Sequence, residues 1–402
     1  MKIVQINVTQ NSGSTGKIAE QIGELIQITG WESYIVSGRT QMPTSSTSIR
    51  INSKIEVLLH IFLKHFAALD GRGSRFATIK LVKKLKQIQP DLIHLHVIHG
   101  SYINYSVLFK YLKQANIPVV WTFHDCWAFT GHCSYFDFIK CYKWKTKCCH
   151  CPASKNLKKF ELFIAAKSNF QLKKGLFTSV ENMTICPVSQ WLGKLVKESF
   201  LSKYKVHIIH NGIDLDVFKP RTSCLRDTLS IGKKFVILGV ANEWGRRKGY
   251  DDFVEIASRC PEWIFIMIGN RNGLSDKLPQ NIITIPFTSG QIELSEYYCI
   301  SNVFLNTTYE DTYPTVNLES IACGTPVLTY NTGGSPESIT KETGVVIKQG
   351  DIIGAIEALK NIEKIGKADY SVKCRKYAED NFSNKEKFHQ YIELYKEILQ
   401  NH

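Results

Sequence analysis

One stretch of this sequence, residues 302–337, carries a full series of structural signals: NVFLNTTYEDTYPTVNLESIACGTPVLTYNTGGSPE. It opens with a short apolar run that is typical of the end of a buried strand. An acidic loop follows, and Thr315 is predicted to cap a helix that ends at Gly324. A second strand is predicted over 326–330, followed by a tight glycine loop. The stretch therefore predicts the order strand, acidic loop, helix, strand, glycine loop.

The start of the predicted helix carries the chemistry of this stretch. We expect three unpaired amides to point outward there: Thr315, Val316 and Asn317. The positive end of a helix dipole with free N–H groups suits a diphosphate. Glu319 lies one turn further on, where a carboxylate can accept both hydroxyls of a ribose. Asp311 and Glu310 precede Glu319 by eight and nine residues. An ordinary strand–loop–helix with solvated acids is the alternative.

The order of motifs over the whole stretch resembles glycosyltransferase family 4, whose members are retaining enzymes that use nucleotide-sugars. Glu319 is followed by ACGTPV at 322–327 and by GGSPE at 333–337, as in that family. The family pattern places another acid eight residues before the glutamate. Here that position is Asp311, with Glu310 beside it, and both are kept as candidate catalytic residues. We assign donor binding in this stretch to Thr315, Val316, Glu319, Gly333 and Gly334.

The rest of the chain alternates strand and helix patterns. Apolar runs predict strands over 3–8, 90–96, 117–123, 184–188, 235–240 and 264–268. Such alternation predicts an α/β fold with parallel, doubly wound sheets. The resemblance implies two facing Rossmann-like domains (GT-B) with an interdomain cleft. We expect an acceptor-side domain over 1–212 with a Cys-rich insertion at 126–152, a nucleotide-sugar domain over 213–383, and a helix over 384–402 that crosses back.

Further candidate residues come from strand ends. His124 follows a predicted strand, and in the resembled family a histidine there faces the donor sugar. Lys248 with its glycine matches a position that holds the diphosphate in that family. The family's arginine lies about five residues earlier, where this chain has Glu243, so Arg247 or Arg246 is the substitute. We therefore name His124, Arg247 and Lys248 as catalytic, and place Asn270 at the donor.

Two motifs suggest phosphate or metal chemistry at first sight. The run NSGSTGK at 11–17 lacks the glycine spacing of a P-loop, and Ile18 stands where a magnesium ligand is needed. We interpret it as a glycine loop and assign Gly16 to the donor; a plain strand-to-helix turn is the alternative. Asp214 and Asp216 form a D-x-D, but we interpret it as a turn. We expect no metal to be required for catalysis.

Half of the twelve cysteines fall within 126–151. Four of them suit a tetrahedral zinc site: Cys133, Cys141, Cys148 and Cys151. In a reducing compartment such clustering favours metal over disulfides. Four neighbouring side chains are potential substitutes: Cys126, Cys149, His132 and His150. Free thiols in an insertion loop are the alternative to a structural zinc. His94, His96 and His99 also resemble a metal set, but alternate strand positions favour packing and hydrogen bonding.

The charge is unevenly distributed along the chain. Residues 1–205 hold 28 Lys and Arg against 11 Asp and Glu, a net +17, so the remainder carries −3 of the total +14. Because no nucleic-acid-binding motif is present, we expect an anionic membrane surface as partner and no nucleic acid. The apolar helix predicted over 54–69 is either buried or interfacial. A basic series follows it: Arg72, Arg75, Lys80, Lys83, Lys84 and Lys86.

These observations predict a cytoplasmic enzyme that is peripheral on the inner face of the cytoplasmic membrane, because no apolar run of spanning length occurs. The resemblance is strongest to transferases of capsule, colanic-acid and O-antigen biosynthesis. It implies a hexosyltransferase that moves sugar from a UDP- or GDP-sugar to a lipid-linked saccharide. A sugar-nucleotide epimerase of the same fold and a non-catalytic binding scaffold are the alternatives.

Overall fold

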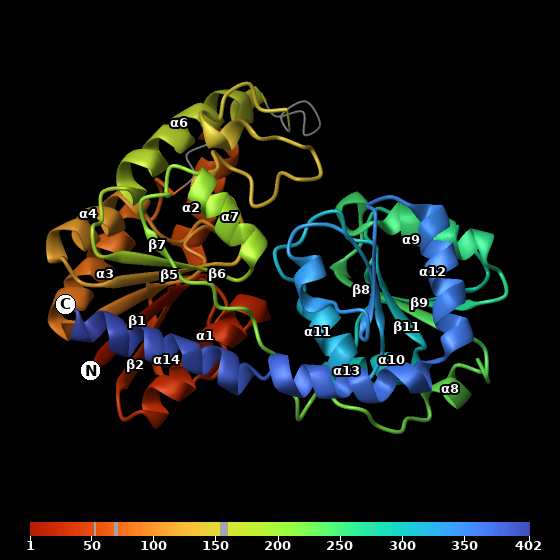
Figure 1. Ribbon diagram of the computed structural model, residues 1–402. Helices are drawn as coiled ribbons and strands as arrows, with labels where there is room; N and C mark the ends of the chain where they lie inside the picture. The colour runs from red at the N-terminus through yellow and green to blue at the C-terminus, as the bar shows by residue number, and fades with distance from the viewer. Residues whose placement is uncertain (52–53, 68–70, 153–159, 276) are drawn as a thin grey trace. The chain divides into compact units, whose positions relative to one another are not determined.

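The computed structural model describes residues 1–402 except 52–53, 68–70, 153–159 and 276. The chain forms two compact units. Unit 1 comprises 1–210 together with 388–402, and unit 2 comprises 211–387. Each unit has its own sheet and its own core (Figure 1).

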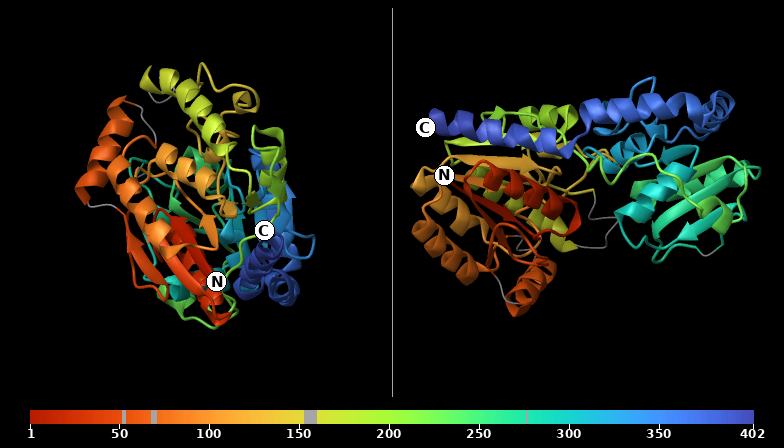
Figure 2. Two further views of the ribbon diagram at one scale, coloured as in Figure 1. Left: turned by 90° about the vertical axis from the view of Figure 1, so that its left-hand side faces the viewer. Right: turned by 90° about the horizontal axis from the view of Figure 1, so that it is seen from below.

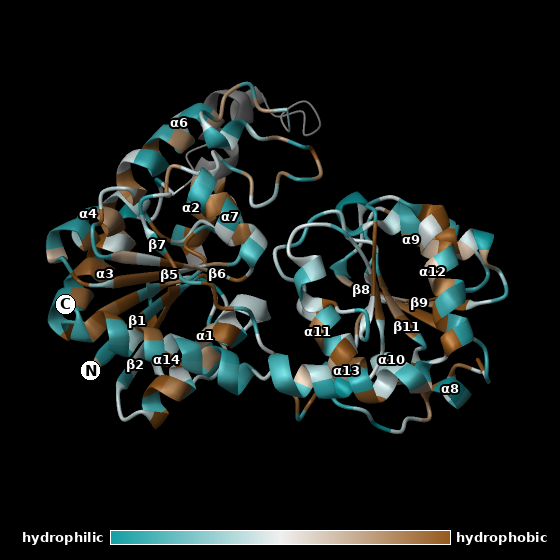
Figure 3. Cartoon of the chain, in the orientation of Figure 1, coloured by the Kyte–Doolittle hydropathy of each residue, from teal (hydrophilic) through white to brown (hydrophobic). Residues whose placement is uncertain are grey.

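Unit 1 is built on a seven-stranded sheet in the order β3-β2-β1-β4-β5-β6-β7. Every pairing in it is parallel. Its strands are β1 (Lys2–Asn7), β2 (Glu32–Ser37), β3 (Thr47–Arg50), β4 (Leu92–Leu95), β5 (Val119–Phe123), β6 (Met183–Pro187) and β7 (Lys205–Val206). Figure 3 shows the strands largely brown, because they carry the apolar residues of the core.

Helices cover both faces of this sheet (Figures 1 and 2). They are α1 (Gly13–Ile28), α2 (Lys54–Ala67), α3 (Arg75–Ile88), α4 (Tyr105–Ala115), α6 (Phe160–Phe177), α7 (Gln190–Glu198) and most of α14 (Asn384–Gln400). Ser189 caps α7, because its hydroxyl oxygen accepts a hydrogen bond from the amide of Leu192. α14 joins the sheet core through two tyrosines: Tyr391 accepts from Thr122 at 2.9 Å, and the Tyr395 hydroxyl lies 2.6 Å from His94 Nδ1.

Unit 2 contains a six-stranded parallel sheet in the order β10-β9-β8-β11-β12-β13. Its strands are β8 (Val236–Glu243), β9 (Ile264–Asn270), β10 (Ile282–Ile285), β11 (Val303–Asn306), β12 (Val327–Tyr330) and β13 (Gly344–Ile347). Its helices are α8 (Leu225–Thr228), α9 (Tyr250–Arg259), α10 (Gln291–Ile300), α11 (Thr315–Ala322), α12 (Ile352–Ile365) and α13 (Lys367–Asn381). The predicted α/β class with parallel, doubly wound sheets is confirmed.

The strand order fixes where ligands can bind. In each sheet the order reverses once, between β1 and β4 in unit 1 and between β8 and β11 in unit 2. The loops after two such strands leave in opposite directions, which opens a crevice at the carboxyl ends of the strands. The loops that follow β8 and β11 carry the candidate residues of unit 2.

Helix α2 differs from the buried alternative raised by the sequence. Ile55, Leu58, Leu59 and Phe62 are 78%, 66%, 59% and 55% exposed. Their spacing of i, i+3, i+4 and i+7 places them on one helix face. His60 of the same helix is buried, and its Nδ1 lies 2.8 Å from the Ser74 hydroxyl. Residues 68–69 of the predicted helix lie outside the described residues.

None of the helices in the described part of the chain has the length and apolar character needed to span a membrane.

Candidate active site

The loops that follow β8 and β11 are joined by an ion pair. Lys248, in the short turn η3 (Arg246–Lys248), places its Nζ 2.7 Å from Asp311 Oδ2. The two side chains are only 23% and 16% exposed. A charge pair with little access to water is screened weakly, so each charge strongly orients the other. The sequence predicted both residues for this site but not their pairing.

Backbone contacts hold the same two loops together. The Tyr309 amide donates to the Arg247 carbonyl at 2.8 Å, and the Thr307 hydroxyl donates to the Gly249 carbonyl at 2.9 Å. Gly249 has φ +69°, and a Cβ at this position would lie 1.9 Å from the Thr307 carbonyl oxygen. Only glycine therefore permits this approach, and the glycine after Lys248 sets the position of the lysine.

The glycine loop after β12 closes against the acidic loop. The Gly334 amide donates to the Asp311 carbonyl at 3.2 Å. Gly333 has φ +53°, and a Cβ there would lie 1.8 Å from the same carbonyl oxygen. Thus the structure brings Lys248, Asp311, Gly333 and Gly334 together from three separate loops.

The start of α11 differs in detail from the prediction. Pro314 is the capping residue, and Thr315 is the first helical residue. The Asn317 amide donates to the Pro314 carbonyl at 3.1 Å, so it is not an outward, unpaired donor as expected. The amides of Thr315 and Val316 precede the helix's own hydrogen-bond ladder. The anion-binding potential of this helix end rests on these two amides.

The acids of the motif occupy different environments. Glu319 accepts a hydrogen bond from the Tyr298 hydroxyl at 3.1 Å. Burial raises the pKa of Tyr298 well above its usual value, and the Glu319 charge raises it further, so the tyrosine stays a donor. Glu310 is 6% exposed, whereas the Asp311 side chain points to Lys248. Of the two neighbouring acids, Asp311 is therefore the one whose carboxylate lies at the Lys248 ammonium group.

The remaining residues assigned to unit 2 lie at the same strand ends. Arg247 Nη1 is 3.4 Å from the Glu310 carbonyl, whereas the Arg246 side chain is 85% exposed. Asn270 ends β9, where its side-chain oxygen accepts from the Asn272 amide at 3.1 Å. Arg247 is therefore tied to the acidic loop, and Asn270 stabilises its own turn.

Sequence reasoning missed one feature of the glycine loop. Ser335 is fully buried in η4 (Ser335–Ser338), and among the described side chains its hydroxyl is one of the few buried polar groups without a hydrogen-bond partner. The sequence marks Ser335 only by its position directly after the two glycines of the loop.

His124 follows β5 in unit 1 and opens a short chain of imidazoles. Its Nε2 lies 3.3 Å from His96 Nδ1, and His96 Nε2 lies 3.0 Å from Gln5 Oε1. Burial lowers the pKa of His124 to about 4, against the opposing effect of Asp125. His124 is therefore a neutral imidazole at neutral pH, which can donate or accept a hydrogen bond but carries no charge.

His94 and His96 are hydrogen-bonded within the sheet. Both side chains are buried, and His94 Nε2 lies 2.8 Å from the Thr122 hydroxyl. His99 instead pairs with Asp125 at 2.9 Å, at the rim of a small pocket that also includes His124 and Trp127. Their partners account for these histidines without a metal.

Gly16 lies in the first turn of α1 rather than in the loop predicted before a helix. A Cβ at Gly16 would lie 2.8 Å from the Thr9 hydroxyl, so the glycine allows its own loop to pack closely. Asp214 Oδ1 accepts from the amides of Asp216 and Val217 at 2.8 and 3.2 Å. This is the turn that the sequence predicted for the D-x-D.

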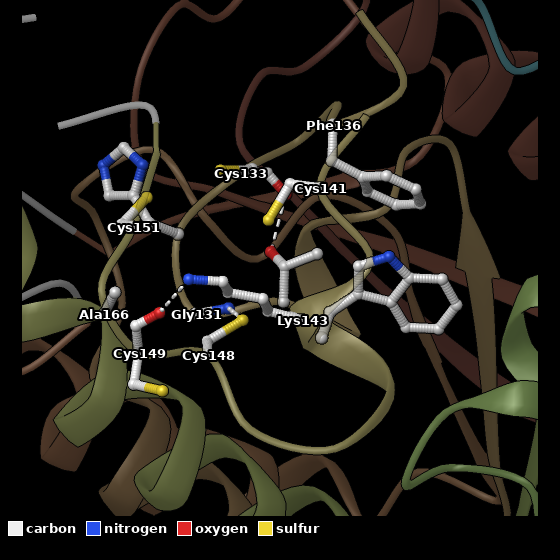
Figure 4. A pocket seen from close by; sticks show the side chains of 12 residues that line it. Gly131, Cys133, Phe136, Cys141, Lys143, Cys148, Cys149, Cys151 and Ala166 are labelled. Atoms are coloured by element: carbon white, nitrogen blue, oxygen red, sulfur yellow. Dashed lines mark hydrogen bonds between the residues drawn. The ribbon is translucent and has the colours of Figure 1, made fainter. Parts of the chain in front are cut away.

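The segment after His124 brings the clustered cysteines to one pocket in unit 1 (Figure 4). Its lining includes Cys133, Cys141, Cys148, Cys149 and Cys151. The Cys133 thiol shares a hydrogen bond with Cys151, and this contact together with burial raises the pKa of Cys133. Burial raises the pKa of Cys148 to about 11. Across the described residues, no three His, Cys, Asp or Glu side chains already stand in a metal-coordinating arrangement.

Two family patterns match the chain. The pattern described as "Glycosyltransferase Family 4" matches residues 18–217, and "Glycosyl transferases group 1" matches residues 225–381. The two matches cover most of unit 1 and most of unit 2.

Individual relatives match over the full length. The chain is 21% identical to "Putative colanic acid biosynthesis glycosyl transferase WcaC" of Escherichia coli K12, over 99% of this chain and 100% of the relative. Sucrose-phosphate synthase from Thermosynechococcus elongatus has a TM-score of 0.73 at 18% identity, over 100% of both chains. Anabaena HepE in complex with UDP-glucose has a TM-score of 0.68 at 14% identity, over 99% of this chain and 100% of that one. At these identities the structural likeness shows the fold alone, two Rossmann-like domains.

Proposed function

The chain belongs to glycosyltransferase family 4 and has the GT-B fold, and we propose that it moves a sugar from a UDP- or GDP-sugar to a saccharide hydroxyl in surface polysaccharide biosynthesis. The polysaccharide assignment draws on the name of the E. coli relative. The nucleotide assignment draws on HepE, which was solved with UDP-glucose.

The observation that carries the proposal is the ion pair between Lys248 and Asp311 at the β8/β11 crevice. Lys248 is paired with an acid that lies four residues before the first helical residue of α11, so the same loop region provides a cation and two helix-start amides for a diphosphate. When the diphosphate binds Lys248, it replaces Asp311 as the partner of the lysine. The Asp311 carboxylate can then accept a hydrogen bond from a sugar hydroxyl. Glu319, oriented by Tyr298, is the proposed ribose contact.

In the proposed reaction the bond between the anomeric carbon and the diphosphate oxygen breaks, and its electron pair stays on the diphosphate. The acceptor oxygen forms the new bond to the anomeric carbon, and its proton passes to the diphosphate oxygen that leaves. Lys248, Arg247 and the α11 amides stabilise the charge that develops on the leaving diphosphate. We propose retention of configuration because the family resemblance implies it, and we assign the neutral His124 to the sugar for the same reason. With these groups at the diphosphate, no metal ion is required.

The acceptor is proposed to be a lipid-linked saccharide on an anionic membrane. The support is the exposed apolar face of α2, formed by Ile55, Leu58, Leu59 and Phe62, together with Phe76 of α3, which is 77% exposed. The segment from residue 72 to residue 86, which includes most of α3, adds six exposed basic side chains: Arg72, Arg75, Lys80, Lys83, Lys84 and Lys86. At about 1 kcal/mol per cation, six cations hold a protein reversibly at an anionic leaflet, and apolar side chains that enter the interface add to this.

Vesicle flotation tests the membrane proposal. The protein should float with vesicles that contain phosphatidylglycerol and not with vesicles of phosphatidylcholine alone. Charge reversal of Lys80 and Lys84 on α3 should lower flotation, whereas reversal of Lys360 and Lys364 on α12, also exposed and four residues apart, should not. Equal flotation of both double variants would contradict the assignment. Leu58→Ser removes an apolar side chain from the exposed face of α2. Binding of this variant to anionic vesicles should therefore become fully sensitive to salt.

A product assay tests the transferase reaction. Purified protein is incubated with a panel of UDP- and GDP-sugars and a membrane extract, and the products are identified by mass spectrometry. A new glycoside supports transfer. An isomerised sugar nucleotide would identify an epimerase, and unchanged donors across the panel would favour a binding scaffold.

A further inference from the structure

The segment that links β5 to the thiol pocket has little regular structure to hold it. Between residues 124 and 151 the described backbone forms only two short 3₁₀ turns, η1 (Trp127–Phe129) and η2 (Lys143–Lys145). A small aromatic cluster supports it, with the Trp144 ring 4.9 Å from Phe129 and 5.1 Å from Phe136. Long loops of this kind gain the most stability when a disulfide or a metal ion closes them.

Four thiols from three parts of this segment line one pocket: Cys133, Cys141, Cys148 and Cys151. In Figure 4 the side chains of these four cysteines lie around the pocket, whereas the sulfur of Cys149 points away from them. All twelve cysteines of the chain are free of disulfides. The spacing that the sequence offered as a tetrahedral set is therefore brought together in space.

The backbone around the pocket is arranged for a thiolate and a tight turn. The Gly131 amide donates to Cys148 Sγ at 3.3 Å, and a Cβ at Gly131 would lie 2.4 Å from the Ala166 carbonyl of α6. Lys143 Nζ donates to the carbonyls of Cys149 and His150 at 3.2 and 2.8 Å, which fixes the turn between Cys148 and Cys151. Amide donors to sulfur are typical outer contacts of metal-bound thiolates.

We propose that Cys133, Cys141, Cys148 and Cys151 bind one Zn²⁺ ion tetrahedrally and that Cys149 is not a ligand. Each thiol gives its proton to solvent as its sulfur–zinc bond forms, and no oxidation takes place. The described thiols line the pocket without forming a coordination set, so the ion draws the sulfurs inward to about 2.3 Å from the metal. Zinc binding thereby tightens the segment.

The site has a structural role for the segment that begins at His124. The same segment contacts α6, where the buried Lys173 donates to the carbonyls of Trp127 and Thr130 at 2.8 and 3.2 Å. A zinc ion at the thiols adds a second attachment beside Ala166, so that the residues after β5 are held at both ends. Loss of the ion should loosen this segment and leave unit 2 unchanged.

Metal analysis of the full-length protein, expressed with and without added zinc and purified without a metal-affinity tag, tests the proposal. We expect about one zinc per chain, lost in Cys148→Ser and kept in the matched control Cys149→Ser. Thermal unfolding should shift downward after removal of zinc by a chelator and return on adding zinc alone. If Cys148→Ser fails to fold, Co²⁺ added to metal-free wild-type protein provides the second readout, because four thiolates give a characteristic sulfur-to-cobalt absorption band.

Three outcomes would overturn the proposal. Protein without zinc whose unfolding temperature is unaffected by chelator or zinc would show free thiols. A disulfide between Cys133 and Cys151 in protein prepared under reducing conditions would assign the pair to redox chemistry. Equal loss of zinc in Cys148→Ser and Cys149→Ser would show that the ligand set is wrong.

Discussion

Replacing Lys248 by methionine removes the charge of the central ion pair while it keeps most of the side-chain volume. At 2.7 Å and an effective dielectric constant of about 20, the gross attraction to Asp311 is about 6 kcal/mol. Desolvation offsets most of it, so we expect the free energy of unfolding to fall by only about 1–3 kcal/mol. The larger effect should be on catalysis.

If Lys248 stabilises the leaving diphosphate, the variant loses a charge-assisted contact that strengthens in the transition state. Such a donor contributes about 2–4 kcal/mol, so kcat/KM should fall about 30- to 900-fold. The assay measures transfer from the active donor at a temperature where circular dichroism shows the variant folded. Arg246→Met is the matched control, because the neighbouring side chain is 85% exposed, and it should keep nearly full activity.

Asp311→Asn separates the two roles of the pair. It frees Lys248 for the diphosphate, so affinity for the nucleoside diphosphate should stay equal or rise while turnover falls. Lys248→Met should lower both. Full kcat/KM in Lys248→Met, or the same loss in Arg246→Met, would refute the assignment of Lys248 to the diphosphate.

Glu319→Ala should weaken binding of the nucleoside diphosphate by about 2–4 kcal/mol, which is about 30- to 900-fold in the dissociation constant, because it removes a ribose acceptor; calorimetry showing unchanged affinity would contradict the ribose contact. Burial lowers the pKa of His124 to about 4, so the unfolded chain binds its proton first as pH falls below about 6.5. Urea unfolding should therefore show stability lost between about pH 6.5 and 4, by about 1 kcal/mol from His124 at pH 5.5, and less loss in His124→Gln. Transfer activity should survive a short exposure to EDTA, whereas strict magnesium or manganese dependence would point to a metal at the diphosphate.

The sequence predicted the fold well because buried parallel strands are apolar throughout. Runs such as that before Asn306 and the one ending at Phe123 leave little alternative to a strand. The order of acids, glycines and helix signals after β11 also predicted the strand, loop, helix, strand and glycine loop that the structure shows there. These are local properties, and a single chain displays them directly.

Contacts between distant segments were harder to predict. Nothing in the sequence shows that Lys248 and Asp311, 63 residues apart, form an ion pair, because side-chain pairing depends on loop conformation. The burial of His60 was equally hard to predict, because it depends on contact with the segment around Ser74, fourteen residues away. The Asn317 amide was assigned as unpaired because the capping residue was placed one position too late.

The central claim is that the β8/β11 crevice of unit 2 holds the nucleotide of the donor. A crystal structure of the full chain with UDP or GDP, whichever raises its unfolding temperature, tests this most directly. The account predicts the diphosphate within hydrogen-bond distance of Lys248 Nζ and the amides of Thr315 and Val316, with Glu319 on the ribose. A nucleotide bound elsewhere, with Lys248 still paired to Asp311, would contradict it.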